Sequence, residues 1–323
     1  MVNMPEHTIW QLHGWRRLLG TIGAFALCVL APLAMAATSV QKNFESPEAG
    51  VDALVEAVRA NDQTMLRSIL GPHSRRLVSS GDEIADERDR EAFIKAYGEA
   101  SKIALETDKQ ATLMIGEDEW PLPIPLVKSG GRWRFDARQG EKEILARRIG
   151  ANELAAIQVC LAIADAEHEY AAQEGGDGVL HYAARFVSTP GNHDGLYWAT
   201  QADEPPSPLG PLLAAAANEG YAKSEPSALA PYHGYYYKLL TGQGPDAPGG
   251  AYEYLVKGRM VGGFAVLAYP ARYAASGIMS FMINHEGVVY EKNLGRNTRE
   301  IAEKMTLFNP DASWKRQSAV NSE

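Results

Sequence analysis

The chain has 323 residues, a formal net charge of −9, 46% hydrophobic residues and 22% charged residues. This length can bury one or two ordinary hydrophobic cores, so the chain does not need disulfides to fold. The acidic balance argues against nucleic acid and against anionic membrane surfaces as partners.

The N-terminus has the order of segments that is typical of a secretory signal peptide. Arg16 and Arg17 precede an apolar run at 18–30, and small residues up to Ala36 follow. The apolar run is shorter than the roughly 20 residues that a membrane-spanning helix needs. We therefore expect cleavage between Ala36 and Ala37, with general secretory export favoured over twin-arginine export. The mature protein is expected to be periplasmic or secreted, without a stable membrane anchor.

Three helices are predicted at the start of the mature chain. The first begins at Pro47 with Ser46 as its N-cap. The second runs from Gln63 to Leu70 and ends at Gly71, and a third, polar helix covers about 87–100.

Short strands follow these helices. Runs at 111–116, 120–128 and 132–138 are separated by turn residues, a pattern typical of antiparallel strands. Prolines at 121, 123 and 125 cannot donate hydrogen bonds to a ladder. The middle run is therefore expected at a sheet edge or as an irregular strand.

A long amphipathic helix is predicted from about Glu141 to Ala172. Its apolar stripe steps by three and four residues, through Leu154, Ile157, Leu161 and Ala164. His168 continues the stripe and is interpreted as a hydrogen-bonded packing residue. Cys160, which alone remains after cleavage, is interpreted as a small buried residue, so no intramolecular disulfide is expected.

The rest of the chain alternates loops rich in glycine and proline with short regular elements. A helix is expected at 209–218, and strands are expected at 233–240, 262–270, 278–285 and 288–294. Residues 284–287 join the last two strands as a hairpin, and Asn297 or Thr298 caps a final helix. The predicted fold class is α+β. A signal peptide (1–36) precedes a cone-like unit of helices and antiparallel sheet (37–140) and a long helix packed on a twisted antiparallel sheet (141–323).

The tetrapeptide at 191–194, Gly-Asn-His-Asp, matches one metal-binding block of calcineurin-like metallophosphoesterases. A two-metal site needs several carboxylates and histidines around both cations. The upstream candidate at 165–168 has the wrong spacing, and no Gly-His-x-His block follows. We interpret the tetrapeptide as a polar turn, with His193 and Asp194 as weak metal candidates. No catalytic residue and no cofactor is predicted.

Aromatic residues gather in two places, at 197–198 and at 232–237. Aromatic rings give a large contact area at low entropic cost, so these residues could line a glycan or peptide groove. Period-two alternation along a strand explains the same pattern more simply. The candidate partner surface consists of Tyr197, Trp198, Tyr235 and Tyr237.

Four blocks of the sequence closely resemble one bacterial secreted family, catalogued as domain of unknown function 2950. These blocks lie at 156–171, 182–198, 231–295 and 308–314. The resemblance implies a secreted bacterial protein without an assigned activity, and it supplies no catalytic residues.

Two looser similarities concern the halves of the mature chain. Residues 44–140 resemble the α+β cone of the nuclear-transport-factor-two/SnoaL superfamily, which hosts both enzymes and binding modules. The second half is similar to the soluble heads of type IV pilin-like proteins, although the prepilin peptide and its membrane helix are lacking.

Three classes of function remain open from the sequence. The first, which we favour, is a non-catalytic interaction or assembly protein of the cell envelope or surface, with an envelope protein or polymer as its partner. The second is a small-molecule-binding module that uses the N-terminal cone, with an apolar pocket. The third is a metal-dependent hydrolase built around His193 and Asp194.

Overall fold

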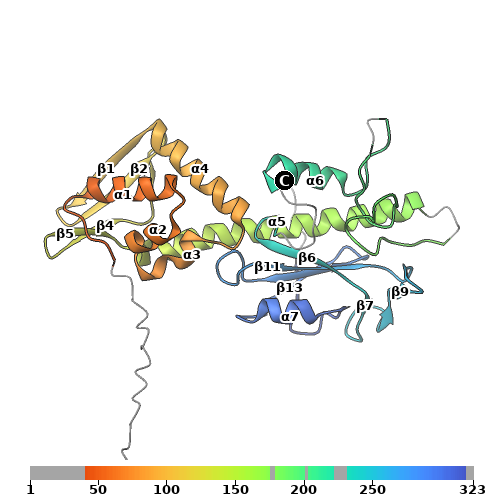
Figure 1. Ribbon diagram of the computed structural model, residues 1–323. Coiled ribbons are helices and arrows are strands. Elements are labelled where there is room, and N and C mark those ends of the chain that lie inside the picture. Colours follow the sequence, from red (N-terminus) through yellow and green to blue (C-terminus); the bar gives the residue numbers. More distant parts are fainter. Residues whose placement is uncertain (1–40, 175–178, 201–202, 222–230, 318–323) are drawn as a thin grey trace, which may run out of the picture. The chain divides into compact units, whose positions relative to one another are not determined.

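The computed structural model describes residues 41–174, 179–200, 203–221 and 231–317 (Figure 1). The predicted signal peptide and its cleavage site at Ala36 and Ala37 lie outside the described residues. Helices and antiparallel sheets are both present, so the predicted α+β class is confirmed.

Helices come first in the described chain. They are α1 (Pro47–Arg59), α2 (Gln63–Leu70), a 3-10 turn (Pro72–Ser74), α3 (Arg75–Val78) and α4 (Glu83–Glu99). The predicted start of α1 is confirmed, because the Ser46 side chain accepts a hydrogen bond from Ala49 N at 3.2 Å. The polar helix begins earlier than predicted, at Glu83, because Asp82 caps it.

An antiparallel sheet follows, in the order β1-β2-β4-β5 with β3 beside β2. Its strands are β1 (Ser101–Thr107), β2 (Gln110–Ile115), β3 (Trp120–Pro121), β4 (Leu126–Ser129) and β5 (Arg132–Phe135). The proline-rich run is split into β3 and β4, as expected of an irregular strand. Strand β1 was not predicted.

The first hydrophobic core lies between these helices and this sheet. Side chains of α1 and α2 meet those of β2, β4 and β5, and the buried ones include Leu54, Ile69, Leu113, Leu126, Trp133 and Phe135. These side chains fill the space between the helices and the sheet of the first half.

The long helix α5 spans Ala137–Glu174. Ile157 and Ala164 are buried as predicted, but Leu154 is 57% exposed and His168 is also exposed. The predicted stripe is wrong at these two positions because the buried face is centred elsewhere, on Ala156, Cys160, Ile163 and Ala166. The interpretation of Cys160 as a small buried residue is confirmed.

A second antiparallel sheet packs against α5, in the order β15-β13-β12-β11-β6. Its strands are β6 (Tyr235–Leu240), β11 (Ala265–Pro270), β12 (Ser280–Asn284), β13 (Val289–Lys292) and β15 (Lys315–Arg316). Figure 1 shows α5 on one face and α7 (Thr298–Lys304) on the other. The predicted β12–β13 hairpin is confirmed. The predicted side-chain cap of α7 is not observed, because Thr298 Oγ1 donates to Gly295 O instead.

The second core contains side chains of α5, of this sheet, and of α7 and the segment that follows it. Its largest fully buried side chains are Leu196, Tyr235, Leu240, Tyr254, Met260, Phe264, Phe281 and Phe308. Helix α6 (Gly210–Asn218) agrees with its prediction. Among the described helices, α5 is long and apolar enough to cross a membrane by length and composition. Core helices of soluble proteins pass the same test, and the apolar face of α5 packs on β11 and β12.

Several short strands lie at the end of the second sheet. They are β7 (Gly242–Gln243), β8 (Tyr252–Glu253), β14 (Leu307–Phe308), β9 (Leu255–Val256) and β10 (Arg259–Met260). Strands β9 and β10 form a two-residue hairpin through Lys257 and Gly258, with φ of 50° and 81°. Positive φ at both turn residues matches the twist of the flanking strands.

One buried carboxylate connects α4 to the second half of the chain. Asp82 is fully buried, and its Oδ1 accepts a hydrogen bond from Ala85 N at 3.1 Å. Its Oδ2 accepts from Gly234 N and from the Tyr221 hydroxyl, each at 2.8 Å. Asp82 is thus at once the cap of α4 and the acceptor for the backbone before β6.

Candidate functional site

The tetrapeptide at 191–194 lies in a turn whose polar groups bond to one another. Thr189 N donates to Asp194 Oδ1 at 2.7 Å, and the Thr189 hydroxyl lies 3.0 Å from Oδ2. The hydrogen bond from the Thr189 amide is the main reason that the pKa of the Asp194 carboxyl is lowered. The His193 ring stacks on Trp198, with ring centroids 4.1 Å apart. Within the part of the chain that the structure describes, no group of three or more His, Cys, Asp or Glu is arranged to hold a metal ion.

The predicted partner surface is divided between core and half-buried positions. Tyr235 is 0% exposed and its hydroxyl donates to Met279 O at 2.9 Å, so its placement on a surface was wrong. Tyr237 is half-buried, and its hydroxyl donates to Tyr232 O at 3.4 Å. Tyr197 and Trp198 are half-buried against the second core. These four side chains therefore form no common exposed surface.

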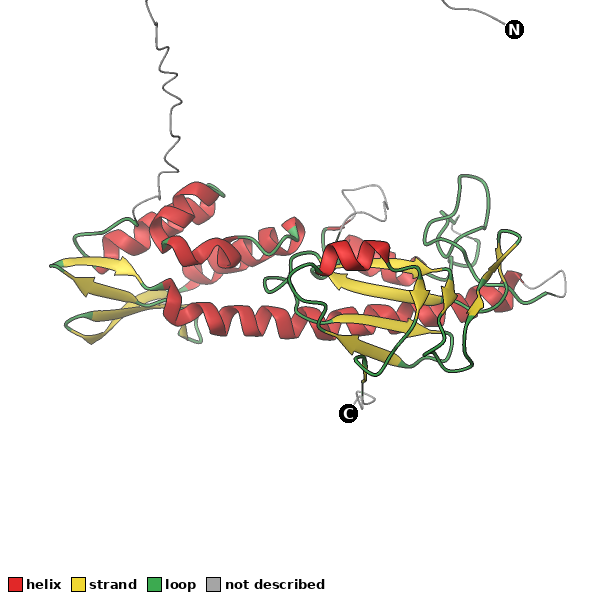
Figure 2. Cartoon of the chain, turned by 90° about the horizontal axis from the view of Figure 1, so that it is seen from below, coloured by secondary structure: helices red, strands yellow, loops and turns green. Residues whose placement is uncertain are grey.

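A different set of apolar side chains is exposed together. Ten large hydrophobic side chains are exposed in the described residues, and five of them form what we call the apolar patch: Val179, Leu180, Tyr252, Leu255 and Val256. They come from two segments that are far apart in the sequence. The β9–β10 hairpin lies near the C-terminal end of α5 in both views (Figures 1 and 2).

Backbone hydrogen bonds hold these two segments side by side. Tyr182 N donates to Met260 O at 2.8 Å, which pairs Tyr182 with β10. Strand β10 in turn pairs with β9, with Met260 opposite Leu255. Strand β8 directly precedes β9 and carries Tyr252. Tyr252, Leu255 and Val256 thus lie on paired backbone, and Val179 and Leu180 lie two to three residues before the bridge at Tyr182.

A continuous series of aromatic rings runs from the apolar patch toward α5. Neighbouring centroids are 5.0–6.0 Å apart except for one pair at 6.3 Å, in the series Tyr252, Tyr254, His285, Phe264, Tyr182 and His168. Tyr254 and Phe264 are fully buried, whereas Tyr252 and His168 are exposed. The buried rings of Tyr254 and Phe264 therefore pack against the exposed rings of Tyr252 and His168.

Charged groups surround this apolar centre. Arg259 lies 2.9 Å from the His181 ring, and Glu286 contributes to raising the pKa of Tyr252. Burial is the main cause that raises the pKa of both Tyr252 and Tyr182, so both phenols are neutral at ordinary pH. Protein-binding surfaces commonly combine an apolar, aromatic centre with a polar rim.

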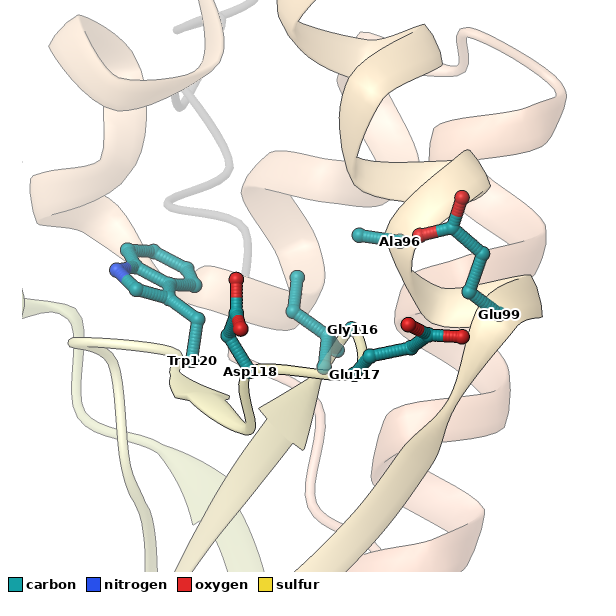
Figure 3. A pocket seen from close by; sticks show the side chains of 7 residues that line it. Ala96, Glu99, Gly116, Glu117, Asp118 and Trp120 are labelled. Atoms are coloured by element: carbon teal, nitrogen blue, oxygen red, sulfur yellow. The ribbon is translucent and has the colours of Figure 1, made fainter.

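The first half carries a separate cavity at its outer surface. Figure 3 shows Trp120 and Asp118 on one side of it and Glu117 and Glu99 on the other. Its volume is about 470 Å³, and Trp120 is 40% exposed. This lining differs from the apolar pocket that the cone-like resemblance led us to expect. Its chemistry suits a cation, because carboxylates attract positive charge and an indole face binds it.

A family model described as a protein of unknown function (DUF2950) matches residues 41–317. The chain belongs to the DUF2950 family. This confirms the closest of the resemblances seen in the sequence. No curated protein and no solved structure gives a significant match, so the cone-like and pilin-like similarities receive no support from them.

The DUF2950 match spans both hydrophobic cores, the apolar patch and the cavity beside Trp120. The sequence analysis did not identify the patch as a site. One signal for it was present: Lys257-Gly258 follows the apolar pair Leu255-Val256, and glycine at the second turn position suits a two-residue hairpin. The exposure of Leu255 and Val256, however, depends on tertiary packing that periodicity does not reveal.

Proposed function

We propose that this DUF2950 protein is exported and acts as a non-catalytic interaction or assembly protein of the cell envelope, which binds a partner protein or polymer through the apolar patch. The observation that carries the proposal is that half of the exposed large hydrophobic side chains of the described residues lie in two segments that the Tyr182–Met260 bridge and the β9–β10 pairing connect. Export is supported by the signal-peptide pattern of the N-terminus.

The physical basis is the unfavourable exposure of apolar surface to water. Burying apolar area contributes about 25 cal/mol per Å², so covering the apolar patch with a partner is favourable. Contiguous exposed apolar surface on a soluble protein commonly marks a site of interaction. The paired backbone under Leu255 and Val256 also lowers the ordering cost of binding.

The arrangement of α5 on an antiparallel sheet supports an assembly role. The soluble heads of pilin-like proteins likewise pack a long helix on an antiparallel sheet. Strand edges and hairpins can also receive an extended chain by backbone pairing.

A double substitution in the patch tests the proposal. Leu255→Asp with Val256→Asp places two charges on exposed positions, so we expect at least a tenfold loss of partner capture with little change in stability. Capture is measured with the immobilised mature protein and a solubilised envelope fraction, by quantifying each retained protein and polymer.

Two control variants define specificity in that measurement. Leu105 is 67% exposed on β1, outside the patch, so Leu105→Asp is expected to retain full capture. His193→Ala alters the 191–194 turn and should also retain it. Equal capture by the double variant and the Leu105 variant would refute the role of the patch.

A second candidate function is binding of a cationic small molecule in the cavity beside Trp120. The specific observation is a half-exposed indole facing carboxylates across about 470 Å³. Choline and spermidine are suitable probes, and either should raise the melting temperature and quench tryptophan fluorescence. Both effects should be lost in Trp120→Ala. No change at millimolar probe concentration would exclude this class of ligand.

A further inference from the structure

Glu167 is a fully buried acid on α5. Its Oε2 accepts a hydrogen bond from Ala183 N at 2.9 Å. Its Oε1 is buried and has no hydrogen-bond partner, and Glu167 forms no ion pair with any described residue. A buried carboxylate with a single donor is costly, whereas the neutral acid is tolerated.

The residue that Glu167 holds belongs to a segment of the apolar patch. Ala183 directly follows Tyr182, whose amide donates to Met260 O at 2.8 Å. Val179 and Leu180, two members of the patch, lie just before them in the same segment. The carboxyl group of Glu167 and the backbone of β10 therefore fix 179–183 from its two sides.

Burial raises the pKa of Glu167 to about 8, and the Ala183 amide opposes this shift. The titratable and charged groups of the surrounding elements include Asp165, His168 and Glu169 on α5, together with His181, Tyr182, Arg259 and His285. Tyr182 responds to Glu167, because the nearby carboxylate adds to the burial that raises the phenol pKa. The proton on Glu167 is thus retained chiefly because the site excludes water.

We propose that Glu167 is a proton-dependent anchor of the apolar patch. When protonated, Glu167 holds 179–183 beside β10; when ionised, it favours a local opening in which water reaches the carboxylate and this segment is released. The inference rests on the proposed function only in what the patch binds, because the anchoring itself needs no partner.

The direction of the pH dependence follows from linkage. The pKa of Glu167 is higher in the closed state than in an opened state, where it is that of an exposed glutamate. Opening therefore becomes easier as pH rises from roughly 4.5 to roughly 8, by about tenfold per pH unit, and levels off above that window. Below the window, both states are protonated and the anchor is at full strength.

Hydrogen exchange of the full mature protein measures this directly. The observable is the protection factor of a peptide covering 179–187, corrected for the intrinsic pH dependence of exchange, between pH 5 and pH 8. In the wild type we expect it to fall by about tenfold per pH unit. In Glu167→Gln, whose amide oxygen can accept from Ala183 N but cannot ionise, the profile should be nearly flat.

Glu153 provides a matched control on the same helix. Its Oε1 accepts from Ile278 N and Met279 N, each at 2.9 Å, and it anchors a different segment. Glu153→Gln should leave the pH profile of 179–187 unchanged. A flat wild-type profile, or an equal slope in Glu167→Gln, would overturn the anchor. If Glu167→Gln does not fold, the wild-type profile alone decides.

The two proposals fail in distinguishable ways. A steep wild-type profile combined with unaltered capture by Leu255→Asp/Val256→Asp would keep the anchor and refute the patch as a binding site. A flat wild-type profile combined with lost capture by Leu255→Asp/Val256→Asp would refute the anchor and keep the patch as a binding site.

Discussion

Tyr235→Ala is expected to lower the free energy of unfolding by about 3–5 kcal/mol, which is among the largest effects of any single substitution in this protein. The ring is fully buried, packs near Phe281, and donates from its hydroxyl to Met279 O. Truncation leaves a cavity between β6, β12 and α5. Tyr235→Phe should cost about 1 kcal/mol, because only the hydrogen bond is lost.

Urea unfolding followed by circular dichroism measures both variants. Tyr252→Ala removes an exposed ring and should change stability by no more than about 0.5 kcal/mol, so it serves as the control. A loss below 1 kcal/mol in Tyr235→Ala would contradict the burial of this residue.

Asp82→Ala is expected to cost about 3 kcal/mol or more, because it removes the acceptor of three donors at once. Two of these donors, Gly234 N and the Tyr221 hydroxyl, bond to a carboxylate oxygen that is fully buried. The third is the first turn of α4. Asp82→Asn keeps one acceptor oxygen and should lie between the wild type and the alanine variant.

Asp62→Ala gives the matched comparison. Asp62 caps α2 by accepting from Met65 N alone at an exposed position, so its removal should cost about 1 kcal/mol. Equal losses in Asp62→Ala and Asp82→Ala, measured by the same urea titration, would mean that Asp82 acts only as a helix cap.

Local rules were sufficient to predict the elements whose stability is local. Ser46 followed by Pro47 placed the start of α1, and the run from Gln63 to Gly71 placed α2, since capping and glycine termination depend on neighbouring residues. The hairpin between β12 and β13 was predicted for the same reason, because its turn is short.

Elements that depend on tertiary pairing were missed. Strand β1 exposes most of its side chains and is held by its register with β2, so it shows no apolar alternation. Strands β7 to β10 have two residues each, which is too short for a period to be recognised. The face of α5 was misplaced at Leu154, because its burial depends on what packs around the helix.

The candidate site could not be predicted from the sequence for a related reason. Tyr235 and Tyr237 were candidates for a partner surface because aromatic residues gather around them, yet Tyr235 is fully buried and Tyr237 is half-buried. Tyr252, Leu255 and Val256 are a less prominent aromatic and apolar run, and they became candidates only through their exposure. The proton anchor at Glu167 likewise required the position of Ala183, sixteen residues away in the chain.

Photo-cross-linking in the cell tests the binding role of the apolar patch most directly. A photoreactive phenylalanine analogue replaces Val256 in the full chain, and the same analogue at Leu105 gives the background. We predict a discrete cross-linked envelope species at position 256 that is absent at position 105 and is lost when Leu255→Asp is added. Identical cross-linking patterns at the two positions would contradict the account.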